Sequence, residues 1–133
     1  MNLLVAGTPQ IFSQGNWPEK MNAPIRHTGN SMNREDVAHL SAVIDIEALL
    51  AYRLAVGQRT REIVQQLMPD ALKQKVDPMR IQRVIDEGAV IEDARGIADY
   101  WRKRTIAGLL LMPATRHNYV HLNEALKLKR KHQ

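Results

Sequence analysis

The strongest constraint on the fold is a stripe of apolar residues between positions 46 and 67. These residues recur at spacings of three, four and seven, which places them on one side of a helix. Asp45 immediately precedes the stripe, where a side-chain oxygen can cap a helix, and Pro69 follows it, where proline stops one. The sequence therefore predicts one long amphipathic helix, and its stripe comprises Ile46, Leu49, Leu50, Ala55, Val56, Ile63, Val64 and Leu67.

Further helices are predicted on both sides of this one. Asn33, followed by acidic residues, caps a shorter helix, so that residues 33–67 form two helices. A short helix is expected over 77–88, where Pro78 occupies the first helical position. One helix is expected over 92–112, and Pro113 would break or kink the chain and begin a last helix over 113–129. We find no strand pattern and no repeat, and the predicted fold class is all-α.

The N-terminal part of the chain is less regular. Residues 1–6 have the pattern of a helix end, because Gly7-Thr8-Pro9 follows them. Residues 7–32 contain many turn-forming residues and are predicted to be one long loop. Phe12 and Trp17 are expected to attach this loop to the helices, because an aromatic ring in a loop is usually an anchor.

Composition limits the remaining possibilities. A chain of 133 residues has the length of a single domain, here 1–133, and 44% of its residues are hydrophobic. No cysteine is present, which excludes disulfides, metal sites built on cysteine thiolates and cysteine nucleophiles. No apolar run is long enough for a membrane span and no signal peptide is evident, so a cytoplasmic protein without a membrane partner is expected. The net charge of +5 is concentrated near the C-terminus, yet nucleic-acid binding is not favoured because interleaved aromatic residues and a helix-turn-helix pattern are missing.

The best candidate for chemistry is a pair of histidines on the last predicted helix. His117 and His121 are four residues apart, so both lie on one face, one helical turn apart. Two imidazoles placed in this way can chelate a divalent metal ion. Glu124 lies on the same face and could be a third ligand or could fix a histidine tautomer. Such a pair is more often structural than metal-binding, so the spacing alone leaves both interpretations open.

Other polar residues could contribute to this site. His27 and His39 could approach the pair in space, and Arg116 could orient an anionic substrate or be an ordinary surface charge. His132, in the terminal tail, is expected to be inert. The zinc-protease pattern is excluded, because Asn118 stands where that pattern requires glutamate. Glycine-rich phosphate loops and the serine-hydrolase elbow are absent from the sequence.

Taken in order, several segments resemble the DinB/YfiT-like family of helical proteins. The resemblance covers residues 1–130 and is carried by a Trp-x-x-Arg-Thr type segment that leads to a His-x3-His-Leu-x-Glu-Ala helix. The matching stretches are Gly7-Thr8-Pro9-Gln10-Ile11-Phe12, Gly15-Asn16-Trp17, Thr28-Gly29-Asn30-Ser31-Met32, Ile46-Glu47-Ala48-Leu49-Leu50-Ala51-Tyr52-Arg53, Asp99-Tyr100-Trp101-Arg102-Lys103-Arg104-Thr105 and Leu109 to Ala125.

This resemblance implies a four-helix bundle that holds zinc or nickel with three histidines. Two of these ligands correspond to His117 and His121. The third comes from the second helix of the family, upstream of the Gly-Thr-Pro-Gln element. Here only six residues precede that element. The given chain is therefore expected to lack the first helix and most of the second, with residues 1–6 as the remnant. Either Met1 is an internal methionine of a longer reading frame, or the protein is shortened.

The resemblance also suggests activities. Members of the family include S-transferases that use low-molecular-weight thiols and an isomerase that depends on such a thiol. We therefore expect a metal-binding protein with thiol-dependent transferase, hydrolase or isomerase activity, and a low-molecular-weight thiol as a possible partner. The alternative is a non-enzymatic helical relic without a competent site. In either case a shortened bundle would expose apolar helix faces, so a homodimer is expected.

Overall fold

The computed structural model describes residues 1–131, including all side chains except those of residues 113 and 114. This part of the chain is mostly helical and contains no strand. One isolated antiparallel bridge joins Lys75 and Thr105. The all-α prediction is thus confirmed for the described residues, whereas His132 lies outside them. No helix within residues 1–131 combines the length and the apolarity that crossing a membrane would require.

The long predicted helix is α3 (Ile46–Gln65), which runs through the middle of the molecule. The side chain of Asp45 caps it by accepting a hydrogen bond from the Ala48 N–H at 2.9 Å. The preceding helix α2 (Arg34–Val43) begins with a reciprocal capping box between Asn33 and Asp36. Both caps satisfy N–H groups that have no partner inside the helix, and both predicted N-termini are confirmed.

The N-terminal residues form a short π-helix, η1 (Asn2–Ala6), which ends at Gly7. Gly7 has a left-handed φ of 68°, a conformation that glycine adopts without steric cost. The carbonyls at this end are covered by α4 (Pro78–Asp86), because the Arg83 guanidinium donates to the Gly7 carbonyl at 3.1 Å. Arg80 of the same helix donates to the Val5 carbonyl. The N-terminal turn is thereby attached to α4.

The prediction of an uninterrupted loop over residues 7–32 was wrong. The segment contains a 3₁₀ turn, η2 (Ile11–Ser13), and a short helix, α1 (Trp17–Lys20), in which Pro18 occupies the first turn. The rings of Phe12 and Trp17 lie 5.9 Å and 5.5 Å from the ring of Tyr52 on α3. These contacts confirm that both aromatic residues anchor the segment, and the anchoring explains why it is ordered into turns.

The prediction of a single helix over 92–112 was also wrong. The structure divides it into η4 (Glu92–Ala94), α5 (Arg95–Arg102) and α6 (Ile106–Leu111). Between α5 and α6 the chain is extended and pairs with the segment that follows η3 (Pro69–Lys73). The Val76 N–H donates to the Arg104 carbonyl at 3.3 Å and the Ile106 N–H donates to the Gln74 carbonyl at 2.9 Å.

The prediction of a last helix over 113–129 was wrong about where that helix begins. Helix α6 continues through a π-turn, η5 (Met112–Arg116), into α7 (His117–Lys131). Pro113 therefore does not break the chain, because a local π-turn accommodates a residue without an N–H group. The Thr115 hydroxyl donates to the Leu111 carbonyl at 2.7 Å and so satisfies one of the carbonyls in this region.

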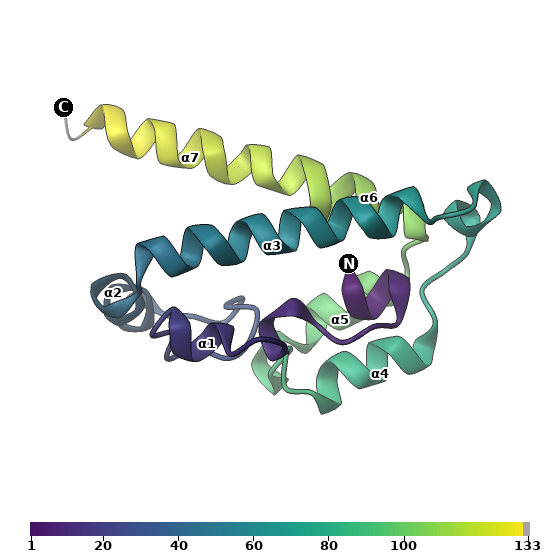
Figure 1. Cartoon of the computed structure of the whole chain (residues 1–133), viewed down its shortest axis with the longest axis horizontal. Coiled ribbons are helices and arrows are strands. Elements are labelled where there is room, and N and C mark those ends of the chain that lie inside the picture. Colours follow the sequence, from purple (N-terminus) through teal and green to yellow (C-terminus); the bar gives the residue numbers. More distant parts are fainter. Residues whose placement is uncertain (132–133) are drawn as a thin grey trace.

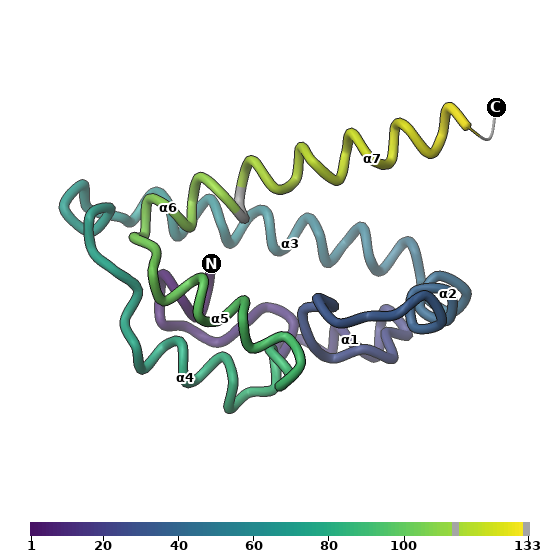
Figure 2. Tube along the Cα trace, turned by 180° about the vertical axis from the view of Figure 1, so that it is seen from behind, coloured from purple at the N-terminus to yellow at the C-terminus, as the bar shows by residue number. Residues whose placement is uncertain are grey.

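The core lies on one side of α3. Figures 1 and 2 show α4, α5 and η1 below α3, while α7 runs along its opposite side. Ile81 of α4 is fully buried and Leu109 of α6 is 2% exposed. They pack in one apolar cluster with residues of η1, α3, α5, α6 and the segment before α4, namely Val5, Ile63, Ala98, Ile106 and Val76.

Helix α7 lies outside this core. Of its side chains only that of Asn118 is partly covered, and the others are exposed. In both views the helix diverges from α3 toward the C-terminus (Figures 1 and 2). The expected four-helix bundle is therefore not established by this arrangement, and it stays a prediction.

Candidate functional site

His117 and His121 meet on the exposed surface of α7. Their Nε2 atoms are 2.8 Å apart and their ring centroids 4.5 Å apart, with the rings almost perpendicular. The distance is that of a hydrogen bond, which forms when one Nε2 atom carries a proton and the other does not. The i, i+4 spacing on an uninterrupted helix produces this contact.

Glu124 lies on the other side of the His121 ring. One of its carboxylate oxygens is 3.1 Å from His121 Nδ1. A proton on Nδ1 would donate to this carboxylate and leave the Nε2 lone pair of neutral His121 directed at His117. Glu124 is thus placed to fix the tautomer of His121, and it does not approach the space between the two Nε2 atoms.

The pair partly matches the requirements of a divalent metal. Zinc binds imidazole nitrogens at about 2.0–2.1 Å in a tetrahedral arrangement, which separates two such nitrogens by about 3.3 Å. The observed 2.8 Å is shorter, so a small rotation of the two side chains would be needed. Both histidines are exposed, which leaves them free to make it. Two nitrogen donors are therefore suitably placed.

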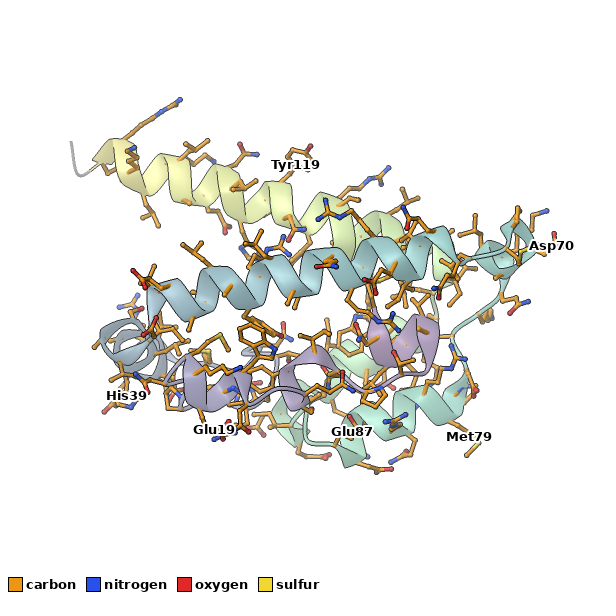
Figure 3. All side chains as sticks on the ribbon, viewed as in Figure 1. Glu19, His39, Asp70, Met79, Glu87 and Tyr119 are labelled. Atoms are coloured by element: carbon orange, nitrogen blue, oxygen red, sulfur yellow. The ribbon has the colours of Figure 1, made fainter. Side chains whose placement is uncertain are left out.

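A third protein ligand is not assembled. Within residues 1–131, no three His, Asp or Glu side chains are grouped so that they could hold a metal ion together. The Nδ1 atom of His27 accepts a hydrogen bond from the Gly29 N–H at 3.1 Å in the segment before α2. Figure 3 shows His39 on α2, well away from Tyr119 near the start of α7. Neither histidine joins the pair, and Arg116 is exposed in η5.

A basic cleft lies between α3 and the beginning of α7. It has a volume of about 590 Å³ and is lined by Arg53, Thr60 and Arg61 of α3 and by Asn118 of α7. Asn118 directly follows His117 in the sequence, but neither histidine of the pair lines the cleft. Two guanidinium groups in such a cleft favour an anionic ligand. In the sequence these arginines belong to the polar side of a helix, and nothing marks them as part of a site.

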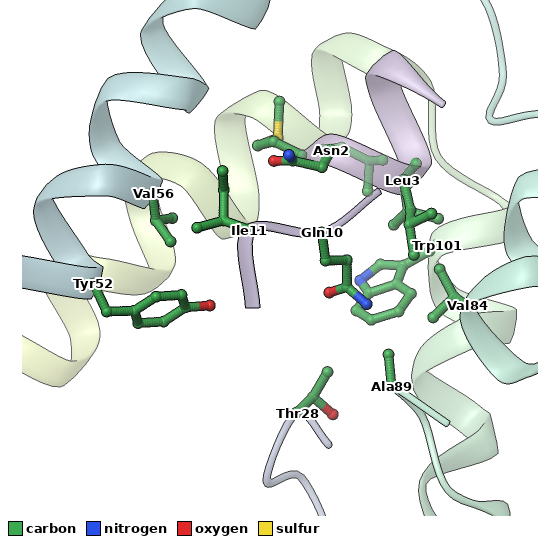
Figure 4. A pocket seen from close by; sticks show the side chains of 13 residues that line it. Asn2, Leu3, Gln10, Ile11, Thr28, Tyr52, Val56, Val84, Ala89 and Trp101 are labelled. Carbon is green, nitrogen blue, oxygen red and sulfur yellow. The ribbon is translucent and has the colours of Figure 1, made fainter. Parts of the chain in front are cut away.

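A separate cavity of about 230 Å³ lies between η1, α3 and α5. Figure 4 shows Gln10, Tyr52 and Trp101 around it, together with apolar side chains. Burial raises the pKa of the Tyr52 phenol above its usual value of 10.0, because the charged form is poorly solvated there. The sequence does not reveal this cavity, because its walls come from segments that are far apart along the chain.

The chain was compared with protein-family models, with curated proteins and with solved structures, and none of them matches it.

Proposed function

We propose that this chain is a DinB-like helical protein that binds a divalent metal ion through His117 and His121. The observation that carries the proposal is the approach of the two Nε2 atoms to 2.8 Å on an exposed helix face. The position of Glu124 at Nδ1 of His121 supports it, because metal-binding histidines generally donate their other N–H to an acceptor of this kind.

The chemistry of the donors indicates which metals suit the site. Imidazole nitrogens are good ligands for zinc and nickel, and both ions accept further ligands beyond two. With two protein ligands, the remaining positions would be left for water or for a small ligand such as a low-molecular-weight thiol. A bound ion would supply Lewis acidity, and Arg53 and Arg61 would attract an anionic substrate to the cleft between α3 and α7. Thiol-dependent transfer, hydrolysis or isomerisation is the class of activity that we propose, and it rests on the resemblance to the DinB-like family.

Equilibrium dialysis against zinc or nickel, followed by metal analysis, tests the proposal. The wild-type chain should retain metal, and His117→Ala or His121→Ala should each lose most of it. His39→Ala is the matched control, since it removes an exposed histidine that lies outside the pair. Equal metal retention by all four proteins would contradict the proposal.

A second candidate is a non-enzymatic helical module that pairs with another copy of itself. It is favoured by exposed apolar side chains on two neighbouring helices. On α3, Leu50 and Leu54 are 61% and 71% exposed, and on α7, Leu122 and Leu126 are 59% and 53% exposed. Each pair is spaced by four residues, so each forms an apolar strip on its helix.

Two physical arguments favour a second copy as the partner. An unpacked helix of 15 residues is only marginally stable in water, so α7 needs a surface to pack against. Further apolar residues on the same helices enlarge the exposed surface to several hundred Å² or more, beyond what monomers usually expose. A stable dimer buries about 800 Å² per partner, which is of similar size. The further exposed apolar residues of α3 and α7 are Ile46, Leu49, Tyr119, Val120 and Leu128.

Size-exclusion chromatography with light scattering tests the pairing. The wild-type chain should elute as a dimer, and Leu54→Glu combined with Leu122→Glu should elute as a monomer. Met79→Glu is the control, because Met79 is 79% exposed on α4, outside both strips. A folded wild-type monomer at every concentration would eliminate this candidate, whatever the outcome of the metal analysis.

A further inference from the structure

The cavity between η1, α3 and α5 combines apolar walls with a few polar groups. Val84, Ala89 and Leu109 form part of the apolar wall, and the Trp101 ring closes one side. The Tyr52 hydroxyl, the Gln10 amide and the Thr28 hydroxyl lie around the same space, as Figure 4 shows. Small-molecule sites typically have this composition, in which apolar walls provide affinity and a few polar groups fix the orientation.

The polar groups are available to a ligand. The structure gives no hydrogen bond within residues 1–131 to the Tyr52 hydroxyl, to the Gln10 side-chain amide or to the Trp101 indole N–H. The raised pKa of Tyr52 keeps its phenol protonated, so that it can donate a hydrogen bond. Together these groups offer donors from the phenol, indole and amide, and one amide acceptor.

The lining also restricts the charge of a ligand. None of the side chains around the cavity is that of Asp, Glu, Lys, Arg or His. Met1 also lines the cavity, and burial lowers the pKa of its amino group, which favours the uncharged amine. A charged molecule would lose its hydration on entry and would find no side chain of opposite charge. The cavity therefore favours neutral molecules, in contrast to the basic cleft that Met1 and Asn2 also line.

The volume of the cavity restricts the size of a ligand. An engineered apolar cavity of about 150 Å³ binds benzene, and drug-sized ligands need about 300 Å³ or more. A cavity of about 230 Å³ therefore accepts one six-membered ring with one or two small substituents. Nucleotides and other large cofactors are too big for it.

We propose that this cavity binds a neutral molecule containing one ring and a hydroxyl or carbonyl group. The ring would lie against Trp101 and the apolar wall, and the polar substituent would face Tyr52 and Gln10. The inference does not depend on metal binding by the histidine pair, since the cavity shares no lining residue with that pair.

The two tryptophans provide a direct test by nuclear magnetic resonance. Cyclohexanol is titrated into the nitrogen-15-labelled full chain in the presence of a chelator, and the two indole N–H signals are followed. The Trp101 signal should shift and reach saturation, while that of Trp17, which does not line the cavity, should change little. Cyclohexanecarboxylate, an anion of similar shape, should cause no saturable shift at neutral pH.

Two variants complete the test. Ala89→Leu should fill the cavity and abolish the saturable shift of Trp101. Should Ala89→Leu fail to fold, Tyr52→Phe decides, because loss of one hydrogen bond should weaken cyclohexanol binding about three- to tenfold. The proposal is overturned if cyclohexanol gives no saturable shift, if the carboxylate binds equally well, or if folded Ala89→Leu or Tyr52→Phe binds as tightly as wild type.

Discussion

At the scale of single residues, His121 has two different neighbours at its two ring nitrogens. His117 lies at Nε2 and Glu124 at Nδ1. All three residues belong to one helix, so their spacing in the sequence was sufficient to predict that they share a face. Their individual roles were left open by the spacing, and the side-chain geometry now favours Glu124 as an acceptor for His121 over Glu124 as a ligand.

We predict that Glu124→Gln weakens metal binding about 10- to 100-fold without abolishing it, as expected for an acceptor behind a metal ligand. The amide can no longer hold the His121 tautomer with a negative charge. Isothermal titration calorimetry with zinc measures the effect. Glu47→Gln, which removes an exposed carboxylate from α3, should bind as wild type, and an equal loss in both variants would refute the specific role of Glu124.

Tyr52 gives a second prediction at this scale, for alkaline pH. Its folded-state pKa is raised by burial, so the folded protein holds the phenolic proton more tightly than the unfolded chain does. The stabilisation is fully present below pH 10.0 and is lost as the pH rises through the folded-state pKa. Urea unfolding at increasing alkaline pH should therefore show a steeper loss of stability in wild type than in Tyr52→Phe, and identical slopes would contradict this account.

At the scale of elements, the helix starts that could be predicted are those with local signals. Asn33, Asp45 and Asp77 each accept hydrogen bonds from N–H groups two or three residues ahead, and each marks the start of a helix. The break between α5 and α6 also has a local signal, the N-cap residue Thr105, which the prediction of one continuous helix did not use. It depends on hydrogen bonds from residues 74–76 to residues 104–106, which are distant in the sequence.

Thr105 is the residue at which this break can be tested. Its hydroxyl caps α6 by accepting a hydrogen bond from the Gly108 N–H at 3.2 Å. We predict that Thr105→Ala lowers the free energy of unfolding by about 1 kcal/mol. Thr105→Ser keeps the hydroxyl and should lose clearly less in the same urea titration. Equal losses would show that the cap contributes nothing.

At the scale of the whole molecule, the covered and uncovered faces of α3 have different roles. One face packs against the core with α4, α5 and α6, while the opposite face and α7 leave many apolar side chains exposed. The amphipathic pattern predicted that α3 has a buried side. This prediction is confirmed at Ile63, which is 3% exposed. It also placed Leu50 on the apolar stripe, whereas this side chain is 61% exposed. Periodicity identifies apolar surface, but it does not show what covers that surface.

Stability should depend on the core and not on the exposed positions. Ile81→Ala is predicted to lower the free energy of unfolding by about 2–5 kcal/mol, because it leaves a cavity at a fully buried site. Met79→Ala, at an exposed position of the same helix, should change it by less than about 0.5 kcal/mol. Denaturant unfolding followed by circular dichroism compares the two, and similar losses would contradict the assigned core.

The central claim, that the two histidines bind a metal together, is tested most directly by X-ray absorption spectroscopy of the zinc-loaded chain. We predict two imidazole ligands at about 2.0–2.1 Å, with lighter oxygen ligands completing the coordination. In His121→Ala the signature of two imidazoles should disappear. A spectrum of the wild-type protein that contains oxygen ligands alone, or one that is unchanged in His121→Ala, would contradict the account.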